Sequence, residues 1–166
     1  TSETNFNDGV GAIIHNDTQA TNPEFFIGML NDGRVYTSGG PGSVNGPQIY
    51  TTDAFNDGKW HNVIGIKSLS NTVEMYVDGE FIGSTSSGSG DMDNNEDWYI
   101  GAARSNGTGA FNGNIGQIAM WDEKLTNAEI NHIYNNGLNS DLAQNTDVYS
   151  SKDNLKAYYK MEGSGN

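Results

Sequence analysis

The sequence contains no cysteine, which excludes disulfide bonds and thiolate metal sites. Basic residues are scarce: 8 Lys and Arg stand against 21 Asp and Glu, giving a formal net charge of −13 at pH 7. Binding to nucleic acid needs a cluster of Lys and Arg on the protein, and so does binding to an anionic membrane surface. No apolar run is long enough to cross a bilayer. We therefore expect no nucleic-acid partner and no membrane insertion, whereas Ca²⁺ or a neutral glycan suits this charge.

Hydrophobic residues are also sparse, at 34% of the 166 residues, and 22 residues are glycine. The length is sufficient for one domain with a core. The composition is typical of short strands joined by many turns. Asn, Asp, Ser, Thr and Gly dominate the predicted loops, a pattern common in secreted and virion-surface β proteins. We expect an extracellular, cell-surface or virion-surface location.

Hydrophobic patterning and turn residues predict a succession of short strands. Asn31-Asp32-Gly33 and Asp78-Gly79 are hairpin turns by composition, because Gly adopts positive φ without a Cβ clash. Alternation is clearest at 72–77, where Val73, Met75 and Val77 share one face. The predicted strands are 10–15, 24–30, 34–38, 48–52, 59–67, 72–77, 80–85, 98–103, 115–121 and 155–161.

One short helix is predicted near residues 126–135. Thr126 is its N-cap, Glu129 completes a capping box three residues later, and Gly137 ends it. Many strands with a single helix indicate an all-β, antiparallel β-sandwich rather than alternating β/α units.

Five motifs in fixed order carry a family resemblance. They are Trp-His-Asn-Val at 60–63, Val-Glu-Met-Tyr-Val-Asp-Gly-Glu at 73–80, Tyr-Ile-Gly-Ala at 99–102, the run at 111–121, and Leu-Thr-Asn-Ala-Glu-Ile at 125–130. This series resembles the LamG-like jelly-roll modules of the concanavalin A-like lectin/glucanase superfamily. The resemblance implies a jelly-roll fold and, as ligand class, a glycan.

The ends of the chain depart from the pattern of these modules. The family's opening strand resembles 155–166 of this chain, and the strands that normally follow it are missing before Thr1. Either 155–166 begins a following module of a longer protein, which we favour, or it completes a permuted sandwich. We divide the chain into a module at 1–140, a polar connection at 141–154 and the strand at 155–166. An exposed sheet edge would then favour self-association or contact with neighbouring modules.

No catalytic arrangement is recognisable. Retaining glycoside hydrolysis needs two carboxylates about 5–5.5 Å apart, and the turn at Asp78 separates Glu74 from Glu80. His15, His61 and His132 lack ligand spacing. We therefore expect no enzyme. The resemblance also places an acidic pair where this chain has Gly116-Gln117, so a family calcium site is not expected there.

One oxygen-rich loop is a candidate calcium site. Asp91, Asp93, Asn95 and Asp97 alternate along it, and closely spaced oxygen ligands in a loop suit a hard cation. The loop lacks the Gly and Glu of an EF-hand loop, and a solvated acidic loop is the alternative interpretation.

Aromatic residues supply the candidate glycan platform: Trp98, Tyr36, Tyr50 and Phe111. Trp98 adjoins the acidic loop, so it would stack a sugar beside a cation, but it also suits a core position. Trp60 and Trp121 are expected in the core.

Two functions remain open. The first is a non-catalytic binding module for carbohydrate recognition or adhesion within a larger secreted, surface or virion protein. The second is a structural module of a phage fibre or surface array with no small-molecule ligand.

Overall fold

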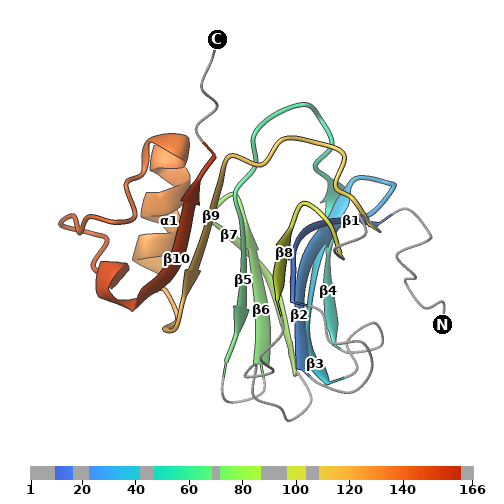
Figure 1. The fold of residues 1–166 in the computed structure, drawn as a ribbon, viewed down its shortest axis with the longest axis horizontal. Coiled ribbons are helices and arrows are strands. Elements are labelled where there is room, and N and C mark those ends of the chain that lie inside the picture. The colour runs from blue at the N-terminus through green and yellow to red at the C-terminus, as the bar shows by residue number, and fades with distance from the viewer. Residues whose placement is uncertain are drawn as a thin grey trace.

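The computed structural model describes residues 10–16, 23–41, 47–68, 72–86, 97–103 and 109–161. The molecule is an antiparallel β-sandwich, as the sequence predicts (Figure 1). The first layer is a five-stranded sheet in the order β4-β3-β2-β1-β8. Its strands are β1 (Gly11–Asn16), β2 (Pro23–Met29), β3 (Arg34–Pro41), β4 (Gln48–Ala54) and β8 (Trp98–Ile100).

The second layer consists of two smaller sheets. One has the order β5-β6-β7 and the other is the pair β10-β9. Its strands are β5 (Val63–Lys67), β6 (Thr72–Val77), β7 (Glu80–Ser86), β9 (Gln117–Trp121) and β10 (Leu155–Lys160). Three predicted strands are shorter than expected by two or more residues: 59–67 begins only at Val63, 98–103 ends at Ile100, and 115–121 begins at Gln117.

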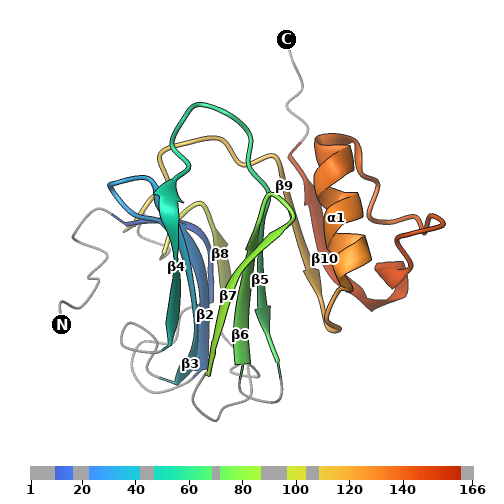
Figure 2. The ribbon, with the colours of Figure 1, turned by 180° about the vertical axis from the view of Figure 1, so that it is seen from behind.

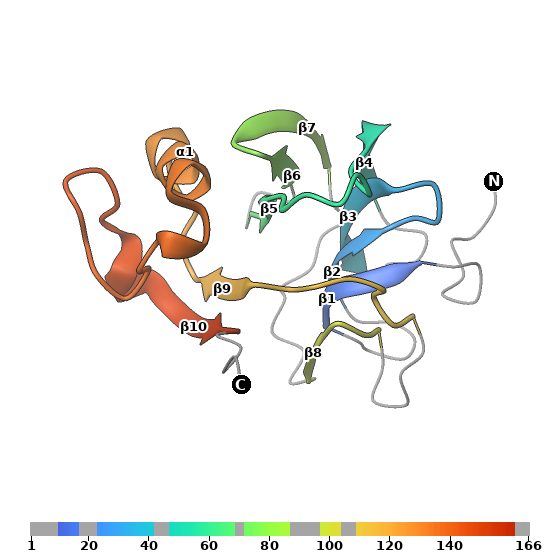
Figure 3. The same ribbon diagram turned by 90° about the horizontal axis from the view of Figure 1, so that it is seen from above.

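Helix α1 (Asn127–Asn136) lies on the side of the second layer that faces away from the five-stranded sheet (Figure 3). Seen from behind, it runs beside β9 and β10 (Figure 2). Two short 3₁₀ helices, η3 (Gly137–Asn139) and η4 (Ser151–Asn154), follow α1 in the sequence and precede β10. Within the described ranges, no helix has the length and apolar character needed to span a bilayer.

In β5, Val63 and Ile64 are adjacent apolar residues, so apolar and polar residues do not alternate strictly. This pattern follows from the position of β5 between two apolar environments. Its partner residues on β6 show this: Gly65 pairs with Met75 of the inter-sheet core, while Ile64 pairs with Tyr76, which faces α1. At Gly65 the ring of Phe25 approaches so closely that a Cβ would lie 2.7 Å from its Cζ. The strand is therefore apolar on both faces instead of alternating between apolar and polar.

Both predicted hairpin turns are confirmed. Gly33 has φ +85°, and Asp78 and Gly79 have φ of 52° and 79°. The face of β6 that was predicted to be buried is also confirmed, since Val73, Met75 and Val77 are at most 2% exposed.

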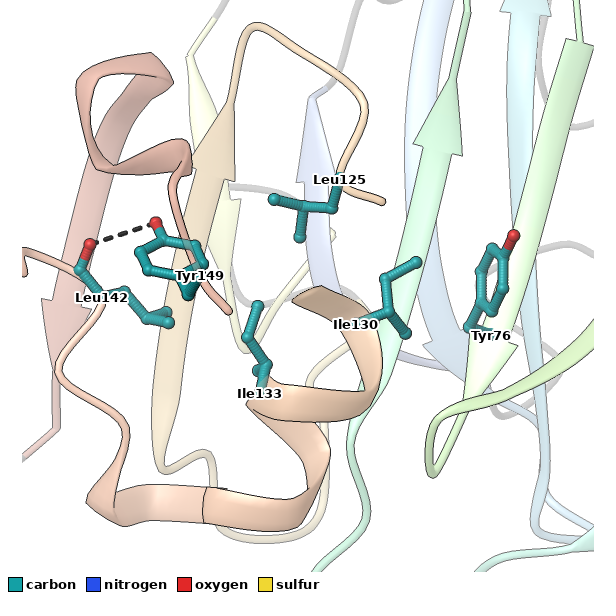
Figure 4. Close-up of a cluster of buried hydrophobic side chains, with 6 residues drawn as sticks. All are labelled: Tyr76, Leu125, Ile130, Ile133, Leu142 and Tyr149. Carbon is teal, nitrogen blue, oxygen red and sulfur yellow. Dashed lines mark hydrogen bonds between the residues drawn. The ribbon is translucent and has the colours of Figure 1, made fainter. Parts of the chain in front are cut away.

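A hydrophobic cluster joins α1 to the second layer (Figure 4). It comprises Tyr76, Leu125, Ile130, Ile133, Leu142 and Tyr149. Two of these, Leu142 and Tyr149, come from the stretch expected to be a polar connection, yet they are 4% and 1% exposed. The Tyr149 hydroxyl donates to the carbonyl of Leu142 and accepts a hydrogen bond from Trp121 Nε1 at 2.9 Å. The segment after α1 therefore belongs to the core of the helix layer.

The capping box at the start of α1 is confirmed. Thr126 Oγ1 accepts from the backbone N–H of Glu129, and Glu129 Oε2 accepts from the backbone N–H of Thr126 at 2.9 Å. The other oxygen, Oε1, accepts from the Ser151 hydroxyl at 2.6 Å and from the Ser150 N–H at 3.0 Å. Burial disfavours the charged carboxylate, but these donors outweigh it and lower the pKa of Glu129 from 4.5 to about 2.

Gly65→Ala should destabilise the sandwich. The new methyl group would lie 2.7 Å from Phe25 Cζ and 3.0 Å from Thr37 Oγ1. Overpacking of this kind lowers the free energy of unfolding by about 1–3 kcal/mol. Urea denaturation measures the change. Gly83→Ala is the matched control, because its nearest neighbour would be Ile49 Cγ2 at 3.6 Å. Equal stability of the two variants would contradict the packing described for β5.

Glu129→Gln should lower the free energy of unfolding at neutral pH. It removes the charge, and the amide presents an N–H donor to groups that are themselves hydrogen-bond donors. A pKa lowered from 4.5 to about 2 corresponds to about 3 kcal/mol at neutral pH. Because the folded-state pKa is depressed, this contribution is present above pH 4.5 and is lost as the pH falls toward 2.

Chemical denaturation from pH 7 to pH 2 tests this expectation. The difference in unfolding free energy between wild type and Glu129→Gln should shrink steadily below pH 4.5. Glu80→Gln, at an exposed position, serves as the control. A difference that does not depend on pH would show that the charge of Glu129 is not the stabilising feature.

Candidate functional site

A surface groove of about 330 Å³ lies where four segments meet: the loop before β5, the entry to β9, η3 and the end of β10. The residues lining it are Trp60, Asn114, Ile115, Gly116, Gln117, Leu138, Lys160 and Met161. Apolar side chains and amide groups thus share one small concavity, an arrangement typical of ligand sites.

Trp60 is exposed in this groove, which contradicts its prediction as a core residue. Its side chain is 59% exposed. Because β5 begins only at Val63, Trp60 belongs to the preceding loop, and the alternation of the strand does not direct it inward. Asn56-Asp57-Gly58, one residue before Trp60, is a turn sequence, and Gly58 has φ +81°. That turn was the available indication that Trp60 lies outside the strand.

Gly116 makes room for the Trp60 ring. A Cβ at this position would lie 3.3 Å from Trp60 Cζ3 and 2.5 Å from Leu138 Cδ2. The backbone of Gly116 also accepts a hydrogen bond from the Met161 N–H at 2.9 Å, which connects β10 to the entry of β9. The absence of a side chain at Gly116 therefore keeps the groove open between Trp60 and Leu138.

The loop that carries Trp60 is held by the neighbouring His61. The Nδ1 atom of His61 lies 2.7 Å from Asp78 Oδ2, and its Nε2 atom lies 2.9 Å from Asp57 Oδ1. Burial acts against protonation, but hydrogen bonds to Asp78 and Asp57 outweigh it, and the pKa of His61 is raised above 6.5. Asp57, bound by Lys59 and His61, has a pKa well below its usual value. Trp60 is thus exposed on a firmly held loop.

Polar groups surround the indole. Gln117 Nε2 donates to the carbonyl of Leu138 at 2.8 Å, which fixes the orientation of this side chain. Lys160 Nζ lies 3.5 Å from Asp141 Oδ1, and Asn114 is exposed at the rim. An aromatic ring bordered by amides and an ammonium group can stack against the apolar face of a sugar ring while hydrogen-bonding its hydroxyl groups.

The predicted aromatic platform is divided between two faces. Trp98 is 39% exposed on the edge strand β8, where it contacts Phe25 of the inter-layer core, so it is not a core residue. Tyr36 is 4% exposed and stacks between Phe26 and Tyr50 on the other face of the same sheet.

Tyr50 and Phe111 are the remaining aromatic candidates. Tyr50 is half-buried on β4, and the Arg34 guanidinium lies 5.7 Å from its ring centroid. Because β4 and β8 are opposite edges of a five-stranded sheet, Tyr50 and Trp98 are about 19 Å apart at a spacing of about 4.8 Å per strand. Phe111 is half-buried beside Gly11 and Gly113. The four residues do not form one surface.

The candidate calcium loop lies largely outside the described residues. This applies to Asp91, Asp93 and Asn95, whereas Asp97 is exposed and its carbonyl lies 3.5 Å from Asn16 Nδ2. In the part of the chain that the structure describes, no group of three His, Asp or Glu side chains is placed to hold a metal ion. Calcium binding at this loop remains a prediction.

If the loop binds Ca²⁺, the thermal midpoint of the intact chain should be higher in millimolar CaCl₂ than in EDTA, because a ligand that binds only the folded state stabilises it. Asp93→Ala should remove the difference, which differential scanning calorimetry measures. Identical midpoints in CaCl₂ and EDTA would disprove the site.

Two of the carboxylates considered for hydrolysis, Glu74 and Asp78, are engaged in other contacts. Lys124 Nζ lies 2.7 Å from both oxygens of Glu74. Asp78 accepts from the Asn62 N–H at 2.8 Å through Oδ1 and contacts His61 through Oδ2. These groups therefore serve local structure.

Comparison with known proteins agrees with this architecture. The family model described as the concanavalin A-like lectin/glucanases superfamily matches residues 3–131. No curated protein sequence matches the chain.

Among solved structures, a "putative carbohydrate binding protein" from Bacteroides ovatus has a TM-score of 0.61 at 20% identity, covering 93% of this chain and 45% of its own length. The heptameric SAP-like pentraxin from Limulus polyphemus has a TM-score of 0.58 at 16% identity, covering 94% and 75%. An S-layer domain-containing protein from Clostridium thermocellum matches with a TM-score of 0.42 at 20% identity, covering 76% and 64%. The matched region is 45% of the B. ovatus protein and 64% of the C. thermocellum protein, so the chain spans less than two thirds of each.

Proposed function

Because this chain belongs to the concanavalin A-like lectin/glucanase superfamily, we propose that it is a non-catalytic carbohydrate-binding module of a longer extracellular or surface protein. The observation that carries the proposal is Trp60, 59% exposed in a groove lined by amide groups and Lys160. The superfamily includes both lectins and glucanases. Engagement of Glu74 and Asp78 in structural contacts supports the lectin type.

The groove has the features that sugar recognition requires. Pyranose rings present C–H groups on one face and hydroxyl groups at the edge, which match an indole face bordered by polar side chains. The chain is acidic overall, and Lys160 is the basic residue that lines this groove. Trp98 on β8 is the second candidate platform and lies on a different strand of the opposite layer.

Trp60→Ala should strongly weaken glycan binding. Removing an aromatic residue at the centre of a binding site weakens affinity by about 2 kcal/mol or more, which is about thirty-fold. A glycan array probed with wild type, Trp60→Ala and Trp98→Ala at equal concentration measures this. We expect Trp98→Ala to bind like wild type.

Gly116→Ala provides a sharper test because it retains the indole. Its methyl group enters the groove and displaces the end of the Leu138 side chain, so binding should weaken while the fold is retained. Near-ultraviolet circular dichroism checks folding of each variant. Binding lost in Trp98→Ala but retained in Trp60→Ala would place the site at β8 instead.

A structural role is the second candidate. Leu138, Tyr159 and Met161 are 50%, 50% and 42% exposed, and among the described strands β10 pairs only with β9. An open strand edge beside apolar side chains favours strand addition from another copy or a neighbouring module. Absence of glycan binding by wild type, together with concentration-dependent assembly in light scattering, would favour this function.

A further inference from the structure

We propose that His61 is a positioning residue whose protonation holds the Trp60 loop, so that presentation of Trp60 depends on pH. The inference rests on the proposed function only for its effect on glycan affinity. The coupling between His61 and Trp60 is argued from the contacts of the loop and needs no ligand.

The His61 ring bridges two separate parts of the chain. Through Asp57 it is bound to the turn that precedes Trp60, at 2.9 Å, and through Asp78 it is bound to the β6–β7 hairpin, at 2.7 Å. The backbone continues the second connection, because Asn62 and Asp78 exchange two hydrogen bonds of 2.8 Å. His61 therefore ties the turn before Trp60 to the β6–β7 hairpin of the second layer.

The surroundings of the ring favour a cation. In the described structure, the charged groups in contact with it are Asp57 and Asp78, and the neighbouring charge is Lys59, whose Nζ lies 2.7 Å from Asp57 Oδ2. Phe55 covers the ring edge-on, with centroids 5.0 Å apart. On the far side of the hairpin, Asn131 and Tyr134 of α1 cover Gly79 and add no charge.

Protonation decides whether both contacts are attractive. The imidazolium donates from both nitrogens, whereas neutral imidazole donates from one and turns a lone pair toward the other carboxylate. Because the pKa of His61 in the folded state is raised, the contacts contribute fully below about pH 6.5, the unfolded value, and are lost as the pH rises through the folded-state pKa. The loop is thus held most firmly in mildly acidic solution and less firmly in alkaline solution.

Weaker contacts in the loop affect the groove directly, because Trp60 lines it. Trp60 rests over Gly116, and the only covalent route between this indole and the β5 strand runs through His61 and Asn62. A loop that loses the Asp57 contact can shift the indole relative to Gly116, which lowers the fraction of molecules with the groove formed. Affinity falls by the same fraction.

NMR spectroscopy of the intact chain tests the coupling without any ligand. Imidazole C–H signals give the titration of His61, assigned with His61→Gln, and the ¹H–¹⁵N indole signal gives that of Trp60, assigned with Trp60→Phe. We expect one shared midpoint above pH 6.5 for both signals. In Asp57→Asn both midpoints should move to lower pH together, and in His61→Gln the indole signal should not change between pH 5.5 and 8.5.

His132→Gln is the matched control. His132 lies on α1 and contacts Thr146, between η3 and η4, so this variant should leave the Trp60 titration unchanged. An indole signal that is constant with pH in wild type, or whose midpoint does not follow that of His61 in Asp57→Asn, would overturn the proposal.

A glycan array at pH 5.5 and pH 8.5 separates this proposal from the proposed function. Wild type should bind at least threefold more weakly at pH 8.5, and His61→Gln should bind equally at both values. No binding at either pH would reject the carbohydrate function, while the NMR result would still decide on the His61 coupling. Equal wild-type binding at both pH values would reject the effect on affinity.

Discussion

The arrangement of the C-terminal part of this molecule depends on one buried carboxylate. Glu129 is 2% exposed, and hydrogen-bond donors rather than a cation stabilise its charge. The donors are Thr126 at the start of α1, and Ser150 and Ser151 before β10. A buried charge is tolerated only when its hydrogen bonds are complete. The contact therefore fixes the distance between the start of α1 and the segment that leads into β10, which sets where β10 pairs with β9.

The groove depends on that placement. Lys160 and Met161 form one wall because β10 runs antiparallel to β9 and ends opposite Gly116. The other wall, Trp60, is held through His61 and Asp78, which belong to two of the sequence motifs behind the family resemblance. His61 and Asp78 are 17 residues apart in the sequence, but their contact brings the motifs at 60–63 and 73–80 together. Two long-range contacts thus place opposite walls of one site.

Features set by neighbouring residues could be predicted from the sequence, and features set by distant residues could not. The capping box at Thr126 spans three residues and the Asp78-Gly79 turn spans two, so composition alone identified both. The second set of Glu129 partners lies 21 and 22 residues away, and nothing local indicates it. Tyr36 was expected at the surface because it was considered singly, whereas stacking against Phe26 and Tyr50 of adjacent strands buries it.

Trp60 shows the opposite error, and its position has functional meaning. Size and apolarity predict burial, which would stabilise the fold by about 2–3 kcal/mol for a large side chain. The turn at Gly58 instead keeps this residue outside β5, and two carboxylates hold the following His61. The exposed part of the indole gains nothing from the hydrophobic effect within the folded chain. Contact with a ligand or another chain would give that surface its stabilising role.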